Sequence, residues 1–298
     1  MSTEETRFLI IDMIEPLIKW TGSKRSQADE IVKRFPIQYN RYFEPFIGGG
    51  SVLYAVKPAV GFASDICKPL IDVYNMMKEN PQLLSDSYEK MWKEFQLTGD
   101  SYYYEVRNHF NESMSPTDFL FLSRTCYTGM IRFNARGEFN QPVHIGRPGI
   151  DPSDMRRIIY DWNRQLSHIT FYNNDYHYLL DVIKSDDFIY LDPPYFNTQG
   201  QYYGGIDFNV FLDFLKKLND VGCKWILSYD GIRGNDDKTV GIPNDLYVHH
   251  EYLYSGNSSH SRLKNLHVDV YESIYYNYDY SDMGNIYKKN KLFPSFNK

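Results

Sequence analysis

Short apolar runs alternate with amphipathic stretches along much of the chain. Five such runs, rich in aromatic and β-branched residues, predict buried strands at residues 41–46, 60–64, 169–172, 187–191 and 224–228. Between them, apolar residues recur at helical spacing, as in the stretch with Leu70, Val73, Tyr74 and Met77. This alternation predicts an α/β fold. Later in the chain, Tyr252–Tyr254 and Val268–Tyr276 predict an antiparallel pair that closes the sheet.

The alternation lapses between Pro81 and about Ser167. Two helical patterns border this segment, the first with Leu84, Tyr88, Met91, Trp92 and Phe95, the second with Met155, Ile158, Ile159 and Trp162. The middle of the segment is irregular. We therefore expect residues 81–167 to form an inserted, mostly helical subdomain, and residues 1–80 and 168–298 to form the α/β domain.

Several connecting segments have weaker patterns. Ala28, Ile31, Val32 and Phe35 predict one face of a helix, which Thr21 or Ser23 would cap. The glycine-rich segment 198–205 is expected to be a mobile loop that closes over substrate, and polar loops are expected at 231–243 and 255–265. The first dozen residues are expected to be a poorly ordered leader, and the last residues a frayed tail.

The strand at 187–191 ends on Asp192-Pro193-Pro194-Tyr195. Prolines cannot donate ladder hydrogen bonds, so the strand must stop there, at the edge of the sheet where α/β proteins bind ligands. The Asp192 carboxylate and the Pro193 carbonyl could accept the hydrogens of an aromatic amine and stabilise the positive charge that develops when the amine attacks a methyl donor. Tyr195 could stack on the ring. A proline-terminated strand with a capping aspartate is the alternative.

A second candidate site follows the strand at 41–46. Its end, Glu44-Pro45-Phe46, leads into Ile47-Gly48-Gly49-Gly50 and a helix from Ser51, and the next strand ends at Asp65. Glycines let a ligand approach the backbone, and an acid at Asp65 suits a ribose hydroxyl, so we favour a nucleoside-containing cofactor. A nicotinamide cofactor is disfavoured because its fingerprint needs glycine where Leu53 stands. Asp175 and Tyr176 could bind the cofactor's adenine, or could be a helix cap and a core ring.

The segment Lys19-Trp20-Thr21-Gly22-Ser23-Lys24 adds a flat apolar wall at Trp20 and a cation at Lys24. Lys24 beside a helix start would suit a carboxylate. A phosphate-binding loop is excluded, because that pattern needs Gly-Lys-Ser/Thr and the order here is Gly-Ser-Lys.

Arginines gather in the helical segment. Residues 120–165 hold no lysine, four acids and seven arginines, Arg124, Arg132, Arg136, Arg147, Arg156, Arg157 and Arg164. Arginine suits bidentate contacts to phosphate or guanine. We favour DNA contact for Arg124 and Arg132, which lie in a glycine-containing stretch, and a solvated helix surface for Arg156, Arg157 and Arg164.

Composition narrows the class of protein. The chain has 298 residues, a net charge of −6 and 42% hydrophobic residues, which are ordinary values for a globular protein. The negative net charge argues against indiscriminate nucleic-acid binding. The three cysteines and eight histidines have no metal-ligand spacing, so we expect neither a metal nor a disulfide. No apolar run approaches the ~20 residues that span a bilayer. We expect a cytoplasmic protein without membrane contact.

Four motifs in order give the chain a resemblance to the Dam-like family of DNA adenine methyltransferases over nearly its whole length. They are Lys19–Lys24, Phe43–Gly50, Thr128–Asn134 with Gly137–Asn140, and Asp192–Tyr195. The order resembles the family's alpha arrangement. The resemblance implies a Rossmann-like mixed sheet with a reversed final hairpin, the methyl donor S-adenosyl-L-methionine, and a flipped adenine held by Asp192, Pro193, Pro194 and Tyr195.

The resemblance also implies roles for other residues. The donor would be bound by Trp20, Lys24, Glu44, Pro45, Phe46, Gly48, Gly50, Asp65, Asp175, Tyr176 and Asp192. The DNA would be contacted by Arg124, Tyr127, Thr128, Met130, Arg132, Asn134 and Arg136. Two positions depart from the family pattern: Ser23 replaces a common glycine, and Thr128 replaces a common asparagine, so the target sequence is left open.

We therefore expect transfer of a methyl group from S-adenosyl-L-methionine to the N6 amine of adenine in double-stranded DNA. The protein is expected to be a monomer. Its expected setting is restriction-modification with a separately acting endonuclease, a phage, or the marking of DNA. Cytosine N4 is the main alternative acceptor, but the resemblance would place serine at position 192 for that reaction. RNA or a protein glutamine are further acceptors, and a silent DNA-binding regulator is the alternative outside enzymes.

Overall fold

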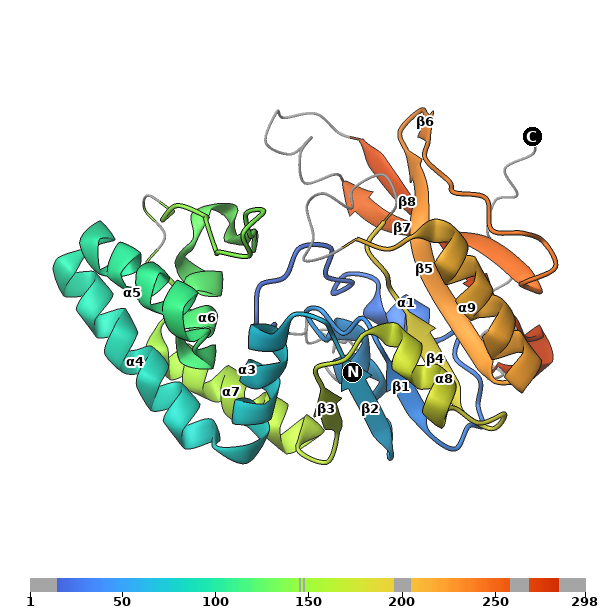
Figure 1. Cartoon of the computed structure of the whole chain (residues 1–298), viewed down its shortest axis with the longest axis horizontal. Coiled ribbons are helices and arrows are strands. Elements are labelled where there is room, and N and C mark those ends of the chain that lie inside the picture. Colours follow the sequence, from blue (N-terminus) through green and yellow to red (C-terminus); the bar gives the residue numbers. More distant parts are fainter. Residues whose placement is uncertain (1–14, 145, 147, 196–204, 258–267, 284–298) are drawn as a thin grey trace, which may run out of the picture.

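The computed structural model describes residues 15–144, 146, 148–195, 205–257 and 268–283. They form one mixed sheet in the order β3-β2-β1-β4-β5-β8-β7, with β6 paired to β5 (Figure 1). The strands are β1 (Tyr42–Glu44), β2 (Gly61–Ser64), β3 (Thr170–Tyr172), β4 (Phe188–Leu191), β5 (Lys224–Arg233), β6 (Asp236–Asp237), β7 (His249–Asn257) and β8 (Asp269–Tyr276).

The direction of the strands follows the predicted pattern. Strands β3, β2, β1, β4 and β5 are parallel, whereas β8 is antiparallel to β5 and β7 is antiparallel to β8. The predicted closing pair is thus confirmed. A largely parallel sheet with one reversed hairpin is the Rossmann-like arrangement that the family resemblance implies.

Two hydrophobic cores cover the two faces of the sheet. Phe188 and Tyr190 of β4 point to the core shared with α1 (Ala28–Val32), α2 (Ser51–Val56) and α3 (Lys68–Glu79). The intervening Ile189 and Leu191 point to the core shared with α8 (Leu179–Val182) and α9 (Phe208–Val221). Because successive side chains alternate between faces, β4 is buried on both sides and reads as a continuous apolar run.

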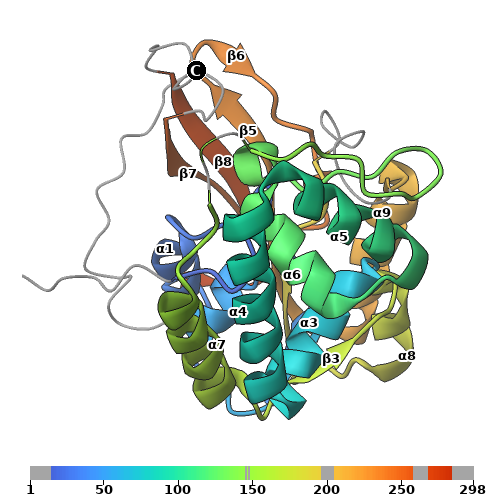
Figure 2. The same ribbon diagram turned by 90° about the vertical axis from the view of Figure 1, so that its left-hand side faces the viewer.

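The segment between β2 and β3 is helical beyond α3. Helices α4 (Pro81–Thr98), α5 (Asp100–Ser113), α6 (Pro116–Thr125) and α7 (Pro152–Leu166) stand together at the β3 side of the sheet (Figures 1 and 2). They share a core with α3, which packs against α4, α6 and α7. The helical character predicted for this segment is confirmed.

An irregular hairpin, residues 126–143, connects α6 towards α7. It begins with a 3-10 turn, η1 (Tyr127–Gly129), and isolated bridges join Cys126 to Val143 and Phe133 to Phe139. At its base, the Tyr127 amide donates to the Pro142 carbonyl at 2.8 Å. At its tip, the Asn134 side chain accepts from the amides of Arg136 and Glu138, so this asparagine organises the turn.

Some local predictions are wrong. Helix α1 ends at Val32, so the buried Phe35 lies beyond the helix. The helix begins after Gln27, so neither Thr21 nor Ser23 caps it. Strand β5 continues to Arg233 and pairs with β6, and β7 reaches Asn257, where polar loops were expected. The predictions for the leader, for 198–204, for most of 255–265, for Arg147 and for the tail lie outside the described residues.

Two short 3-10 turns complete the described elements, η2 (Tyr176–Tyr178) before α8 and η4 (Tyr280–Asp282) after β8. In the part of the chain that the structure describes, no helix is both long and apolar enough to cross a bilayer.

Candidate active site

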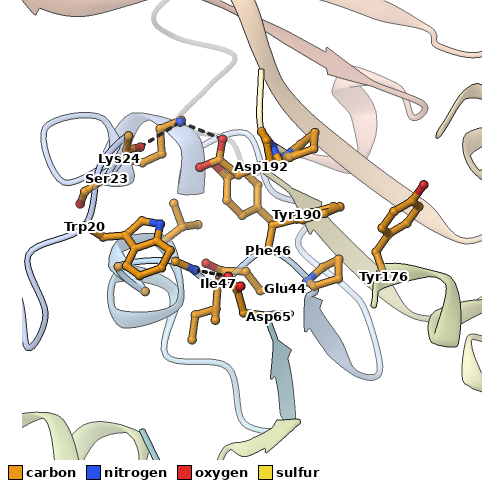
Figure 3. Close-up of a pocket in the computed structure, with 18 of the residues that line it drawn as sticks. Trp20, Ser23, Lys24, Glu44, Phe46, Ile47, Asp65, Tyr176, Tyr190 and Asp192 are labelled. Atoms are coloured by element: carbon orange, nitrogen blue, oxygen red, sulfur yellow. Dashed lines mark hydrogen bonds and ion pairs between the residues drawn. The ribbon is translucent and has the colours of Figure 1, made fainter. Parts of the chain in front are cut away.

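A pocket opens where the parallel strands end. It lies at the switch point between β1 and β4, where neighbouring strands lead to helices on opposite faces of the sheet. Every residue predicted to bind the donor or to act in catalysis lines this pocket: Trp20, Lys24, Glu44, Pro45, Phe46, Gly48, Gly50, Asp65, Asp175, Tyr176, Asp192, Pro193, Pro194 and Tyr195 (Figure 3). Segments far apart in the sequence therefore meet at one site.

The glycine turn after β1 forms one wall. Gly48 and Gly50 have φ angles of 45° and 64°, a region that other residues rarely adopt. A Cβ at position 48 would lie 2.8 Å from the indole of Trp20, and one at position 50 would lie 2.8 Å from the Tyr74 hydroxyl. Tyr74 in turn donates to the Gly48 carbonyl at 2.9 Å. The turn therefore needs glycine for both conformation and space.

Asp65 is fixed at the end of β2 by backbone amides. Its carboxylate accepts from the amide of Gly48 at 3.2 Å (Figure 3). It also accepts from the amide of Cys67 at 3.0 Å. Burial raises the pKa of Asp65 to about 6, although both amides favour the ionised form. The two amides thus hold the acid in place beside the glycine turn.

Lys24 and Asp192 form an ion pair in which the cation is buried and the carboxylate is half-buried. The Lys24 ammonium lies 2.8 Å from Asp192 Oδ1 and 3.2 Å from the Gly22 carbonyl oxygen, and it also lies 4.9 Å from the centre of the Tyr195 ring. Burial raises the pKa of Asp192 to about 6, Lys24 lowers it, and the nearby Glu272 raises it. The carboxylate is therefore oriented by a cation and is ionised at neutral pH.

A third acid lies at the floor of the pocket. Glu44 is 2% exposed and accepts a hydrogen bond from the Tyr42 hydroxyl at 2.6 Å. Burial raises the pKa of Glu44 to about 8, against the opposing effect of that hydrogen bond. Glu44 is thus largely neutral at pH 7.

The aromatic residues of the pocket have structural partners as well. Tyr176 is buried, with its ring 5.2 Å from that of Phe46, and Asp175 caps η2 through the His177 amide. The structure thus shows the helix cap and the core ring for this pair, and both residues also line the pocket, so adenine binding stays a prediction. Tyr195 packs edge-on against Tyr229 at 5.8 Å.

Most residues predicted to contact DNA lie on the hairpin 126–143, away from the pocket floor. Tyr127, Met130, Arg132 and Arg136 are exposed, and Thr128 and Asn134 are half-buried. Lys19, beside Trp20, donates to the Thr128 carbonyl at 2.8 Å. The hairpin is therefore tied directly to the segment that walls the pocket.

Arg124 is the exception, and the prediction that it contacts DNA does not fit the structure. Its side chain lies in the interior, where it donates to the carbonyls of Pro16 and Leu17. Burial lowers its pKa to about 10. On α7, Arg156, Arg157 and Arg164 form ion pairs with neighbouring acids, as expected of a solvated helix surface.

Two residues close to the Lys24–Asp192 pair were missed. Tyr190 lines the pocket from β4, two positions before Asp192 and on the same face, which the period of a strand would have indicated. Glu272 of β8 lies next to this pair, with its carboxylate 3.6 Å from the Lys24 ammonium. No local motif marks Glu272, since its position depends on strand pairing.

Comparison with known proteins decides the family. The sequence model of the D12 class N6 adenine-specific DNA methyltransferases matches residues 20–267, most of the chain. The chain belongs to this family. It is a DNA methyltransferase that acts on the N6 amine of adenine, and methyl transfer to cytosine N4 is set aside.

Among the similar proteins is a type II methyltransferase, M.MjaIII of Methanocaldococcus jannaschii, 28% identical over 72% of this chain and 84% of the relative. A DNA adenine methylase of Haemophilus influenzae is 30% identical over 65% of this chain and 70% of the relative. Among solved structures, the rRNA methyltransferase AviRa of Streptomyces viridochromogenes aligns with 86% of this chain and 84% of its own, with a TM-score of 0.38 and 8% identity.

The family assignment leaves the chemistry of the pocket to its own residues. Within the described residues, no cluster of three or more side chains could hold a metal ion. The strongest chemical feature is instead the ion pair of Lys24 and Asp192 at the carboxyl end of β4.

Proposed function

We propose that the pocket binds S-adenosyl-L-methionine and that Asp192, Pro193 and Tyr195 hold an extruded adenine beside it. The observation that carries the proposal is the convergence of the glycine turn, Asp65 and the Lys24–Asp192 pair in one pocket. An adenine amine inside a duplex is unreachable, so the base must leave the stack.

The residues of the pocket fit this donor. A glycine turn without space for a Cβ allows close approach of the backbone, and Asp65 is held in place to accept from ribose hydroxyls. Phe46, Tyr176 and Asp175 offer an aromatic wall and a polar edge for the donor's adenine. Trp20 covers the turn from the other side. When bound, the donor supplies an electrophilic methyl group on a sulfonium.

The protein's own residues prepare the acceptor. The Asp192 carboxylate and the Pro193 carbonyl would accept hydrogen bonds from the two N6 hydrogens. These bonds favour a pyramidal amine and stabilise the positive charge that develops on it. Tyr195 would fix the ring in line with the methyl group. Once N6 carried the methyl group, Asp192 would relay the proton that this amine loses to water.

The DNA is proposed to lie over the hairpin 126–143. Its exposed Arg132 and Arg136 would contact phosphates or bases, and Tyr127, Thr128, Met130 and Asn134 complete the set of contacts. In this proposal residues 81–167 form the target-recognition insert, and residues 1–80 and 168–298 form the donor-binding catalytic domain. Arg124 is left out because it is buried.

The biological setting is also a proposal. One relative named above is called a type II methyltransferase and the other a DNA adenine methylase, which supports a role in restriction-modification or DNA marking. We propose a cytoplasmic monomer that acts separately from any partner endonuclease.

Incubation with labelled S-adenosyl-L-methionine and adenine-containing duplexes of varied sequence tests the proposal. Label should appear in N6-methyladenine. Asp192→Ala should lower the rate by at least about 10³-fold while leaving DNA affinity largely intact. Asp186→Ala, an exposed acid before the other end of β4, is the matched control and should retain activity. A DNA-dependent function that survived Asp192→Ala would favour a silent regulator.

A further inference from the structure

Lys24 faces two carboxylates, and only one belongs to the catalytic motif. Its ammonium lies 2.8 Å from Asp192 Oδ1 and 3.6 Å from Glu272 Oε2. The side chains are 5%, 18% and 13% exposed for Lys24, Asp192 and Glu272. Two acids around one buried cation leave a net negative charge at the edge of the pocket when both are ionised.

Both strands next to β8 are irregular near Glu272, β5 directly opposite it and β7 beyond the regular Leu253–Glu272 pair. In the pairing with β5, Tyr229 opposes Ser273 and Ile232 opposes Tyr271, so two β5 residues lie opposite Glu272 alone. In the pairing with β7, the register shifts between Tyr254 and Gly256. Bulges of this kind re-aim side chains and occur beside active sites.

Each irregularity has a specific consequence for Glu272. A Cβ on Gly231, in the β5 bulge, would lie 2.2 Å from the Tyr271 carbonyl oxygen and 2.9 Å from the Ser273 nitrogen, so only glycine allows this approach to β8. In the β7 bulge, the Ser255 hydroxyl donates to Glu272 Oε1 at 3.3 Å. The two bulges therefore hold one glutamate in one orientation, with its second oxygen towards Lys24.

We propose that Glu272 is a positioning residue for methyl transfer, which holds the Lys24 ammonium in place beside Asp192 and adds a second negative charge next to the reacting amine. The inference rests on the proposed function, since it assigns Asp192 to the adenine amine. By sharing the cation, Glu272 keeps Lys24 from neutralising Asp192 completely. The positive charge that develops on N6 then faces a site with an excess of negative charge.

The same arrangement predicts a pH effect. The titratable groups around Asp192 are Lys24, Glu272 on β8, Glu44 on β1, Tyr190 on β4 and Tyr195. Of these, Lys24 lowers the pKa of Asp192 and Glu272 raises it. Removing the charge of Glu272 should therefore lower the pKa of Asp192 and move the acidic limb of the rate profile to lower pH.

The test compares single-turnover methyl transfer at saturating S-adenosyl-L-methionine and duplex DNA across pH. Glu272→Gln should lower the plateau rate by roughly 10- to 100-fold, the loss typical when a partner that orients a site residue is removed. Its acidic limb should shift to lower pH, with DNA affinity unchanged. Glu272→Asp, which keeps the charge, should keep the limb in place and recover part of the rate. Asp269→Asn, an acid-to-amide change elsewhere on β8, should change neither quantity.

The outcomes separate the inference from the proposed function. A Glu272→Gln variant with the wild-type rate, or with a lower rate and an acidic limb that has not moved, overturns the positioning role. The proposed function still stands in that case if Asp192→Ala is inactive. An inactive wild-type protein overturns both. If melting curves show that Glu272→Gln does not fold, Ser255→Ala takes its place, because it removes only the hydrogen bond to Glu272 Oε1. Its rate should fall in the same direction by less, and an unchanged rate counts against the inference.

Discussion

The indole of Trp20 lies directly against Gly48, so closely that a Cβ on this glycine would be 2.8 Å from two atoms of the indole ring. One residue comes from the segment before α1 and the other from the turn after β1. Their contact joins the wall of the pocket to its glycine turn. The space left for a donor therefore depends on a residue without a side chain.

Gly48→Ala should weaken donor binding by at least about tenfold, a loss of about 1.4 kcal/mol. The added methyl group would push the indole away and would require an alanine at a φ of 45°. Gly99→Ala is the matched control, since Gly99 has a φ of 72° but open space around a Cβ. It should cost about 1–2 kcal/mol of stability and leave the affinity unchanged. Titration calorimetry with S-adenosyl-L-methionine measures the first effect, and equal affinities would contradict it.

Lys24→Met should move the acidic limb of the methyl-transfer rate to higher pH. In the wild-type protein, we expect the rate to rise as pH increases through about 6, because burial raises the pKa of Asp192 to about 6 and the reaction needs the carboxylate ionised. Lys24 lowers this pKa, so its loss should raise it. Burial also raises the pKa of Asp65 to about 6, and saturating donor keeps any effect of Asp65 on donor binding out of the measured single-turnover rate. A limb that stays at the wild-type position in Lys24→Met would refute the assignment to Asp192.

The donor site could be predicted because its determinants are local. Pro193 and Pro194 must end a strand, and glycines at 48 and 50 must follow one, so both motifs fall at the same edge of a parallel sheet. The order of strands and helices could be predicted as well, because the spacing of apolar residues is also a local property of the sequence. Their ends were less accurate: β5 extends to Arg233 because it pairs with β8 beyond the end of β4.

Arg124 and Glu272 could not be assigned from the sequence for the opposite reason. The carbonyls that hold Arg124 belong to Pro16 and Leu17, more than 100 residues away in the chain. Glu272 meets Lys24 only because β8 pairs between β5 and β7, and both of those strands are bulged near it. In both cases the environment of a charged side chain is set by tertiary packing, which residue type and spacing do not encode.

Glu44→Gln should stabilise the protein at pH 8 more than at pH 5. Burial raises the pKa of Glu44 from 4.5 to about 8, so between these values the folded state binds a proton that the unfolded state does not. The wild-type protein therefore loses stability as pH rises through this window, by up to a few kcal/mol in the free energy of unfolding. A neutral glutamine avoids this loss. Urea denaturation of both proteins at several pH values measures the difference, and a constant difference would contradict the prediction. Glu112→Gln, on the exposed end of α5, controls for the removal of an acid elsewhere.

Arg124→Met and Arg132→Ala should have opposite effects, although both arginines lie near the start of the hairpin. Arg124→Met removes the donor for two carbonyls of the 15–20 segment, so it should cost about 1–3 kcal/mol of stability for a group left unpaired. Arg132 is exposed on the hairpin, so Arg132→Ala should leave the melting temperature unchanged and weaken DNA binding. If Arg132 contacts a phosphate, the slope of log K against log salt should fall by about 1. Melting curves and DNA binding at several salt concentrations measure both quantities. A loss of DNA affinity in a fully folded Arg124→Met protein would restore Arg124 to the DNA interface, and unchanged binding in Arg132→Ala would remove Arg132 from it.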